Sequence, residues 1–176
     1  INKISKNNKN KYKFVTRSIT GLNSRTALEI LPGVIKKIFE NDIIVIQIGL
    51  NDSWHFKSLK GNANVSIRSF KANLNEIYKK CVKKGLKNIY FVNYHKILKD
   101  RKEINKKNIN QNLSIYNNYI NTFCKKKKIK LINIAKNTKK INPKIMCLPN
   151  PDGVHLSKNG IKIYANIILN NLIKNL

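Results

Sequence analysis

Two side chains near the carboxyl end of the sequence, Asp152 and His155, have the types and spacing of an acid–base pair. In a turning loop, a separation of three residues lets the carboxylate reach a ring N–H of the imidazole. That contact would fix the tautomer and stabilise the imidazolium formed during proton transfer. On spacing alone, the commoner explanation is a surface turn in which the aspartate has a helix-capping role. Both explanations stay open at this point.

A second polar group, from Gly49 to Asp52, directly follows an apolar run that ends at Ile48. Glycine permits a tight backbone at the end of a strand. Asn51 offers a neutral amide donor, which suits the stabilisation of a transient oxyanion. An Asx turn is the structural alternative for the asparagine. Asp52 is expected to brace the loop rather than to touch a substrate.

The elements that would position these groups alternate between short apolar runs and longer segments of helical periodicity. This alternation is typical of an α/β fold with a parallel sheet. Strands are predicted at residues 12–16, 42–48, 88–93 and 129–134. Helices are predicted from Ser24, where Pro32 should kink or restart the helix, and at residues 65–83, 107–125 and 157–174. The proline-rich stretch 137–152 is predicted to be an irregular loop.

Functional residues in such a fold gather just after the strands, outside their carboxyl ends. Those positions are Gly21, Gly49 to His55, Tyr94 with His95, and the loop before His155. We expect one domain over residues 1–176, since 41% hydrophobic residues suffice for one core. No apolar run approaches the roughly 20 residues of a membrane-spanning helix. No signal peptide is visible in the basic opening stretch.

Three cysteines, Cys81, Cys124 and Cys147, are widely spaced and lack metal-ligand spacing, which favours reduced thiols and a cytoplasmic location. The net charge of +28 is the strongest compositional signal. Clustered basic charge is typical of nucleic-acid binders. However, the excess is almost entirely lysine and accompanies abundant asparagine and isoleucine, as an AT-rich genome would supply. Arginine, which is favoured for forked phosphate and guanine contacts, is scarce.

Three stretches, taken together, resemble the SGNH/GDSL hydrolase family. VIQIGLNDSWH (residues 45–55) resembles its third conserved block, a strand followed by Gly-x-Asn-Asp. PDGVHLSKNGIKIYANII (residues 151–168) resembles the fifth block, Asp-x-x-His before the closing helix. RSITGLNSRTALEILPGVI (residues 17–35) is similar to the second block, in which a glycine opens a helix. The resemblance implies a three-layer α/β/α, flavodoxin-like sandwich with a parallel sheet.

The resemblance also implies roles for individual residues. His155 would be the general base and Asp152 would orient it. Gly21, through its backbone N–H, and Asn51, through its side-chain amide, would form the oxyanion hole. The reaction would be acyl transfer through an acyl-serine and hydrolysis of an ester or thioester. It would require no cofactor and no metal.

The first block of the family, Gly-Asp-Ser after the first strand, is absent from residues 1–20. Ser5, Ser18, Ser24 and Ser53 stand in the wrong context to replace it. The nucleophile is therefore expected outside this chain, and with it the first strand of the sheet. A domain lacking that central strand would have long unpaired edges. We therefore expect a chain that is incomplete at its N-terminus rather than an evolved pseudoenzyme.

The leading hypothesis is an ester hydrolase for a small-molecule ester, whose serine lies elsewhere. The alternatives are a non-catalytic binding module on the same scaffold and a lysine-rich polyanion-binding protein. Four side chains are expected either to line a substrate pocket or to pack in loops: Trp54, His55, Tyr94 and His95. The substrate, whether an acyl ester, acetylated sugar, lysophospholipid or thioester, and the oligomeric state stay open.

Overall fold

The structure, a computed structural model, describes residues 13–54, 63–98 and 109–173. In this part of the chain, β1 (Ile43–Gln47), β2 (Asn88–Val92) and β3 (Lys130–Ile132) form a parallel sheet in the order β1-β2-β3. Ile43 pairs with Asn88, and Tyr90 pairs with Lys130. β1 and β2 are rich in β-branched and aromatic residues, as expected when helices cover both faces of a sheet.

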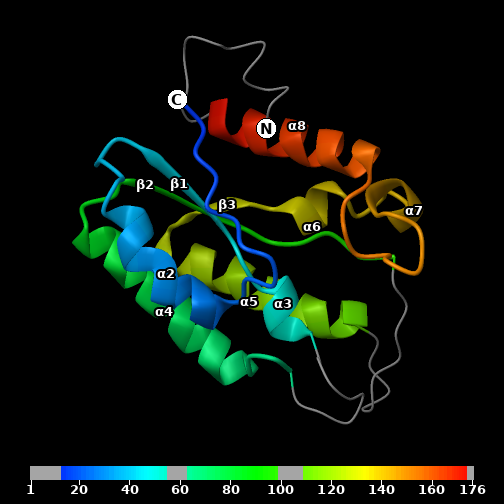
Figure 1. The fold of residues 1–176 in the computed structure, drawn as a ribbon, viewed down its shortest axis with the longest axis horizontal. Coiled ribbons are helices and arrows are strands. Elements are labelled where there is room, and N and C mark those ends of the chain that lie inside the picture. The colour runs from blue at the N-terminus through cyan, green and yellow to red at the C-terminus, as the bar shows by residue number, and fades with distance from the viewer. Residues whose placement is uncertain (1–12, 55–62, 99–108, 174–176) are drawn as a thin grey trace.

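Helices cover the sheet on both sides (Figure 1). Helices α2 (Ser24–Ile35), α4 (Ile67–Lys83) and α5 (Ile109–Lys127) lie on one side, and α8 (Lys158–Ile173) lies on the other. The alternation of side chains along β2 divides the core accordingly. Ile89 and Phe91 belong to the core with α2, α4 and α5, whereas Tyr90 and Val92 belong to the core with α8. The predicted three-layer α/β/α fold is confirmed.

Short helices fill the loops at the carboxyl ends of the strands. These are α3 (Leu50–Ser53) after β1, α6 (Ile134–Asn137) after β3, and α7 (Pro143–Met146) inside the proline-rich stretch. Each has a single turn, too short for a detectable helical period in the sequence. The stretch expected to be irregular therefore holds one turn of helix.

One predicted strand is wrong. Residues 13–16 form no strand, and Tyr12 lies outside the described residues. Phe14 and Val15 are 39% and 59% exposed, so this apolar run is not covered by a core. A strand needs a neighbouring strand that pairs with its backbone N–H and C=O groups. In the sheet of the described residues, no strand pairs with residues 13–16. Helix α2, for its part, continues through Pro32 without restarting.

Within the described residues, no helix is both long enough and apolar enough to cross a bilayer.

Candidate functional site

Asp152 and His155 meet in the loop before α8. Oδ2 of Asp152 lies 2.7 Å from Nδ1 of His155, and Oδ1 accepts the backbone N–H groups of Val154 and His155 at 2.8 Å. The hydrogen bond from the His155 side chain, followed by those from the backbone, lowers the pKa of Asp152 to about 2. The carboxylate is therefore ionised at neutral pH, and Nδ1 of His155 carries the donated proton. The His155 side chain is 78% exposed, so its Nε2 is accessible.

The same contacts show elements of both explanations of the Asp–His spacing. Asp152 does form a surface turn, through the two N–H groups that it accepts. It does not cap α8, because Ser157 Oγ accepts the N–H of Gly160 at 3.0 Å. The turn and the carboxylate–imidazole contact coexist in one arrangement.

Neighbouring segments hold this loop in place. Cys147 and Leu156 form an antiparallel bridge, and Leu148 donates its N–H to the carbonyl of His155 at 2.7 Å. From the other side, the N–H of Leu98 binds the carbonyl of Gly153 at 2.9 Å. The loop that carries the acid–base pair is thus fixed both to the end of α7 and to the segment that follows β2.

Asn51 and the turn at Gly21 form a second pair. Asn51 Nδ2 donates to the carbonyl of Leu22 at 2.9 Å. Gly21 has a φ of 73°, a conformation that glycine adopts without steric cost, and open space lies where a Cβ would be. The segment after Gly21 and the helix after β1 therefore meet, as the resemblance implies. In the part of the chain that the structure describes, no hydrogen bond links this pair to the Asp152–His155 pair.

Asp52 braces the same region from inside. Its fully buried carboxylate accepts the N–H of Ser24, the first residue of α2, with both oxygens at 2.9 and 3.1 Å. Burial raises the pKa of Asp52, and the hydrogen bonds from Ser24 oppose that rise. A carboxylate at a helix N-terminus also complements the helix dipole. Asp52 thus supports the position of the Asn51 loop and is closed to solvent.

Two of the serines that the sequence analysis considered, Ser24 and Ser53, have structural roles. Ser24 is buried, and its hydroxyl accepts from Asn73 Nδ2 at 2.9 Å. Ser53 is also buried, and its hydroxyl donates to the carbonyl of Leu50 at 2.8 Å. Ser18 is exposed in the segment before Gly21. Ser5 lies outside the described residues.

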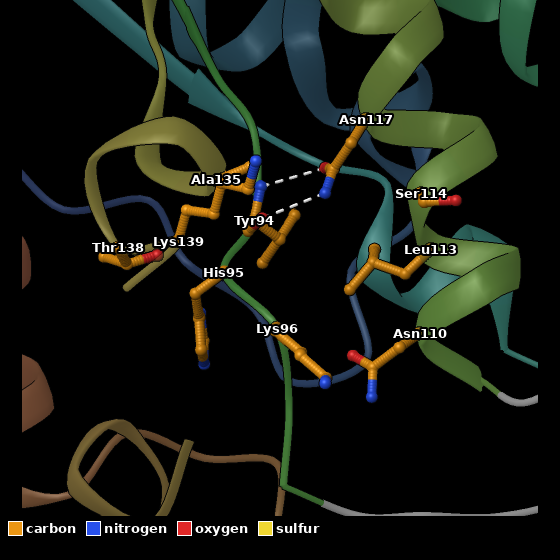
Figure 2. A pocket seen from close by; sticks show the side chains of 10 residues that line it. All are labelled: Tyr94, His95, Lys96, Asn110, Leu113, Ser114, Asn117, Ala135, Thr138 and Lys139. Atoms are coloured by element: carbon orange, nitrogen blue, oxygen red, sulfur yellow. Dashed lines mark hydrogen bonds between the residues drawn. The ribbon is translucent and has the colours of Figure 1, made fainter. Parts of the chain in front are cut away.

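Among the predicted pocket residues, Trp54 and Tyr94 are half-buried and pack against the core on the α8 side. His55 lies outside the described residues. Tyr94 and His95 also line an open hollow of about 260 Å³, whose other walls come from α5 and from residues around α6 (Figure 2). Figure 2 shows Lys96 and Asn110 among the side chains that line this hollow.

His95 is buried at the centre of a polar chain that the sequence did not reveal. The hydroxyl of Tyr164 lies 2.7 Å from His95 Nδ1 and accepts from Gln47 Nε2 at 3.4 Å. The other ring nitrogen of His95, Nε2, lies 3.4 Å from Cys147 Sγ. Burial lowers the pKa of His95 to about 4. The chain joins β1, α8, the end of β2 and the loop that carries His155.

Asparagines hold the segment after β2. Asn117 on α5 accepts the N–H of Tyr94 and donates to its carbonyl, both at 2.9 Å (Figure 2). Asn110, two turns earlier on the same helix, makes the same pair of bonds with Ile97. Each side-chain amide therefore bonds both backbone groups of a residue that lies beyond the end of β2. These roles depend on tertiary contacts. In a sequence with so many asparagines, their spacing could not indicate which ones make such contacts.

No group of three or more His, Cys, Asp or Glu side chains suited to a metal ion occurs among the residues that the structure describes.

Comparisons with known proteins show the family and the fold of this chain. A family model described as GDSL-like Lipase/Acylhydrolase matches residues 3–168. A comparison with curated proteins gave no match. Among solved structures, a GDSL-like lipase from Bacteroides thetaiotaomicron is similar, with a TM-score of 0.72, 19% identity, and coverage of 99% of this chain and 80% of the other.

Two acetylxylan esterases are also similar in fold. AlAXEase has a TM-score of 0.75 and 20% identity, with coverage of 96% of this chain and 85% of the other. Axe2 from Geobacillus stearothermophilus has a TM-score of 0.71 and 19% identity, with coverage of 89% and 70%.

Proposed function

The chain belongs to the GDSL-like lipase/acylhydrolase family, and from that premise we propose that it is the serine-less part of an ester or thioester hydrolase. His155 is the general base, Asp152 orients it, and Gly21 and Asn51 stabilise the oxyanion. The nucleophilic serine comes from outside this chain. The observation that carries the proposal is the 2.7 Å contact between Asp152 Oδ2 and His155 Nδ1.

The reaction proceeds in two acyl transfers. Nε2 of His155 takes the proton of the serine hydroxyl as the serine oxygen bonds to the acyl carbon and the carbonyl π electrons move onto oxygen. As the tetrahedral intermediate collapses, the imidazolium gives that proton to the leaving alkoxide or thiolate. Water, deprotonated by the same imidazole, then attacks the acyl-serine. As the second tetrahedral intermediate collapses, the imidazolium returns its proton to the serine oxygen and the acid is released. Asp152, ionised throughout, stabilises the imidazolium in both steps.

The contacts of Asn51 suit a role as an oxyanion donor. An amide nitrogen carries two N–H bonds, and the bond to the carbonyl of Leu22 uses one of them. The second is available to an oxyanion beside the Gly21 turn. Because the first bond fixes the amide, the second donor is preorganised, which is what makes such a group effective in catalysis.

Two features support a nucleophile supplied from outside. The hydroxyls of Ser24 and Ser53 are buried and bound to Asn73 and Leu50. In addition, β1 forms the edge of the described sheet, and Val45, an apolar residue in the middle of this strand, is 39% exposed. An edge strand of this kind can accept a further strand. A strand followed by Gly-Asp-Ser would bring its serine to the same end of the sheet as Asn51.

Acetylated carbohydrates are the first substrate class to test, because two of the similar structures are acetylxylan esterases. A short acyl group also suits a base as exposed as His155, which needs no deep acyl tunnel around it. Long-chain acyl esters serve as the comparison in the same assay.

The test begins with the coding sequence upstream of Ile1, which should encode a strand followed by Gly-Asp-Ser. The longer product should hydrolyse an activated acetate ester, and Asn51→Ala should lower kcat by about 10²–10³ with little change in KM. Asn118→Ala, an exposed asparagine on α5, is the matched control. An in-frame stop upstream, or a longer product without esterase activity, would contradict the proposal and favour a binding module.

A further inference from the structure

The edge of the sheet opposite the candidate site, where the strands begin, is strongly basic. It consists of residues 36–42 before β1, residues 83–87 before β2, and residues 125–130, which end at the first residue of β3. We call this surface the basic edge. In Figure 1 it lies on the left, where α4 ends. Its lysines are Lys36, Lys37, Lys83, Lys84, Lys87, Lys125, Lys126, Lys127, Lys128 and Lys130, of which all but Lys130 are exposed.

Direct contacts join the three segments into one surface. The N–H of Lys87 binds the carbonyl of Glu40 at 3.4 Å, and Asn88 Nδ2 donates to the carbonyl of Asn41 at 3.3 Å. Lys130 Nζ in turn donates to Asn88 Oδ1 at 3.4 Å. The lysines therefore contribute to one field rather than to separate loops.

The two carboxylates of the basic edge are occupied locally. Glu40 forms an ion pair with Lys87. Asp42 accepts the N–H of Phe39 through Oδ2 at 2.9 Å and closes a turn in which its own N–H binds the carbonyl of Phe39 at 3.0 Å. Neither carboxylate lies in the cluster at 125–130, so most of the positive charge is uncompensated.

The turn closed by Asp42 exposes the aromatic side chain of Phe39 among these lysines. Phe39 is 77% exposed, the most exposed of the large apolar side chains in the described residues. Val82, at the end of α4 beside Lys83, is 48% exposed. An apolar side chain held out by a fixed turn and surrounded by lysines matches the chemistry of an anionic bilayer surface. There the lysines meet headgroups, and the ring enters the acyl boundary.

We infer that the basic edge docks on anionic lipid bilayers, with Phe39 inserted at the interface. Bilayers are favoured over nucleic acid because arginine is absent from the basic edge, and because phosphate contacts give no reason for an exposed Phe39. The candidate site lies at the opposite edge of the sheet. A bound molecule would therefore keep Asp152 and His155 open to the aqueous phase.

The experiment measures sedimentation of the chain with phosphatidylcholine vesicles that contain about one third phosphatidylglycerol. Each lysine near such a surface contributes about fivefold in affinity. The triple variant Lys125→Gln, Lys126→Gln, Lys127→Gln should therefore weaken binding by about a hundredfold. Lys136→Gln, Lys140→Gln, Lys144→Gln removes the same charge near the opposite edge and should change binding by less than about tenfold.

Phe39 is tested separately, because charge alone would not require it. Phe39→Ser should weaken vesicle binding by about tenfold, whereas Ile161→Ser, at an exposed position on α8, should have little effect. Brominated lipids should quench the fluorescence introduced by Phe39→Trp more strongly than that of the parent chain.

Three outcomes would overturn the inference. Equal losses from the two lysine triples would show that binding follows net charge rather than the basic edge. Vesicle binding that is unaffected by Phe39→Ser, with no quenching after Phe39→Trp, would exclude insertion. Tighter retention on duplex DNA than on the anionic vesicles at the same salt concentration would assign the basic edge to nucleic acid instead.

Discussion

Nδ1 of His155 lies 2.7 Å from Oδ2 of Asp152, and the other oxygen of the same carboxylate accepts two N–H groups of the turn between these residues. One carboxylate therefore fixes the backbone of the loop and the orientation of the imidazole together. Any change that weakens the turn also releases the imidazole. The pair is thus a structural unit of four residues rather than a contact between two flexible side chains.

The first prediction concerns the acid range. The pKa of Asp152 is lowered to about 2 in the fold, so its ionised form stabilises the folded state. That contribution is present above about pH 4 and is lost as the pH falls toward 2. Because the side chain is partly exposed, the contribution is about 1 kcal/mol or less. Urea unfolding should show Asp152→Asn less stable than the parent at about pH 6 and nearly equal to it at about pH 2. An equal difference in stability between Asp152→Asn and the parent at both pH values would contradict a lowered pKa of Asp152.

The second prediction concerns His95, whose burial lowers its pKa to about 4 from 6.5. Below about pH 6.5 the unfolded chain takes up a proton that the folded chain excludes. The contribution of the neutral His95 to the free energy of unfolding is therefore present above that pH and declines as the pH falls to about 4. Between about pH 7 and pH 5 this amounts to about 2 kcal/mol. His95→Gln should be less stable at pH 7 but should lose about 2 kcal/mol less on acidification, as measured by urea unfolding. Identical pH profiles for the two proteins would exclude a buried neutral imidazole.

The third prediction tests Asn117, whose side-chain amide bonds both the N–H and the carbonyl of Tyr94. Asn117→Ala leaves both backbone groups of Tyr94 without their partners, which costs about 2–3 kcal/mol in the free energy of unfolding. Asn118→Ala, one residue away and exposed, should stay within about 0.5 kcal/mol of the parent. Thermal unfolding of the two variants compares them directly, and similar losses in both would show that the amide of Asn117 has no special role.

The fourth prediction concerns the contact between α7 and α8. A Cβ on Gly160 would lie 2.0 Å from the carbonyl oxygen of Met146, a backbone atom that cannot rotate away. Gly160→Ala should therefore destabilise the fold by about 3 kcal/mol or more. Gly33→Ala, on α2 with open space around it, should instead stabilise the fold by up to about 1 kcal/mol. Denaturant midpoints distinguish the two variants, and a Gly160→Ala variant as stable as the parent would contradict the close packing between α7 and α8.

The sequence predicted the elements whose signal is local and strong. The β-branched run at 42–48 became β1 (Ile43–Gln47), and the amphipathic segment at 65–83 became α4. The strand expected at 12–16 was wrong, because pairing depends on a neighbour that a local pattern does not reveal. Of the expected site residues, Asp152 meets His155 and Asn51 meets the turn at Gly21. Their catalytic roles remain predictions.

Other parts of the site had no signal in the sequence. His95 was expected either in a pocket or in packing, and its partners Tyr164 and Cys147 come from distant segments that only the fold brings together. The bracing of α2 by Asp52 likewise joins residues 28 positions apart. Such contacts depend on the packing of whole layers, so residue types and spacing within one segment cannot predict them.

The most direct test of the central claim is fluorophosphonate labelling of the product that includes the segment encoded before Ile1. We expect a label on a serine within that segment. Labelling should slow by about three or more orders of magnitude with His155→Ala and should proceed normally with Lys158→Ala, an exposed control in the first turn of α8. The chain of residues 1–176 alone should stay unlabelled. A label on Ser18, Ser24 or Ser53, or labelling of the longer product that does not depend on His155, would contradict the account.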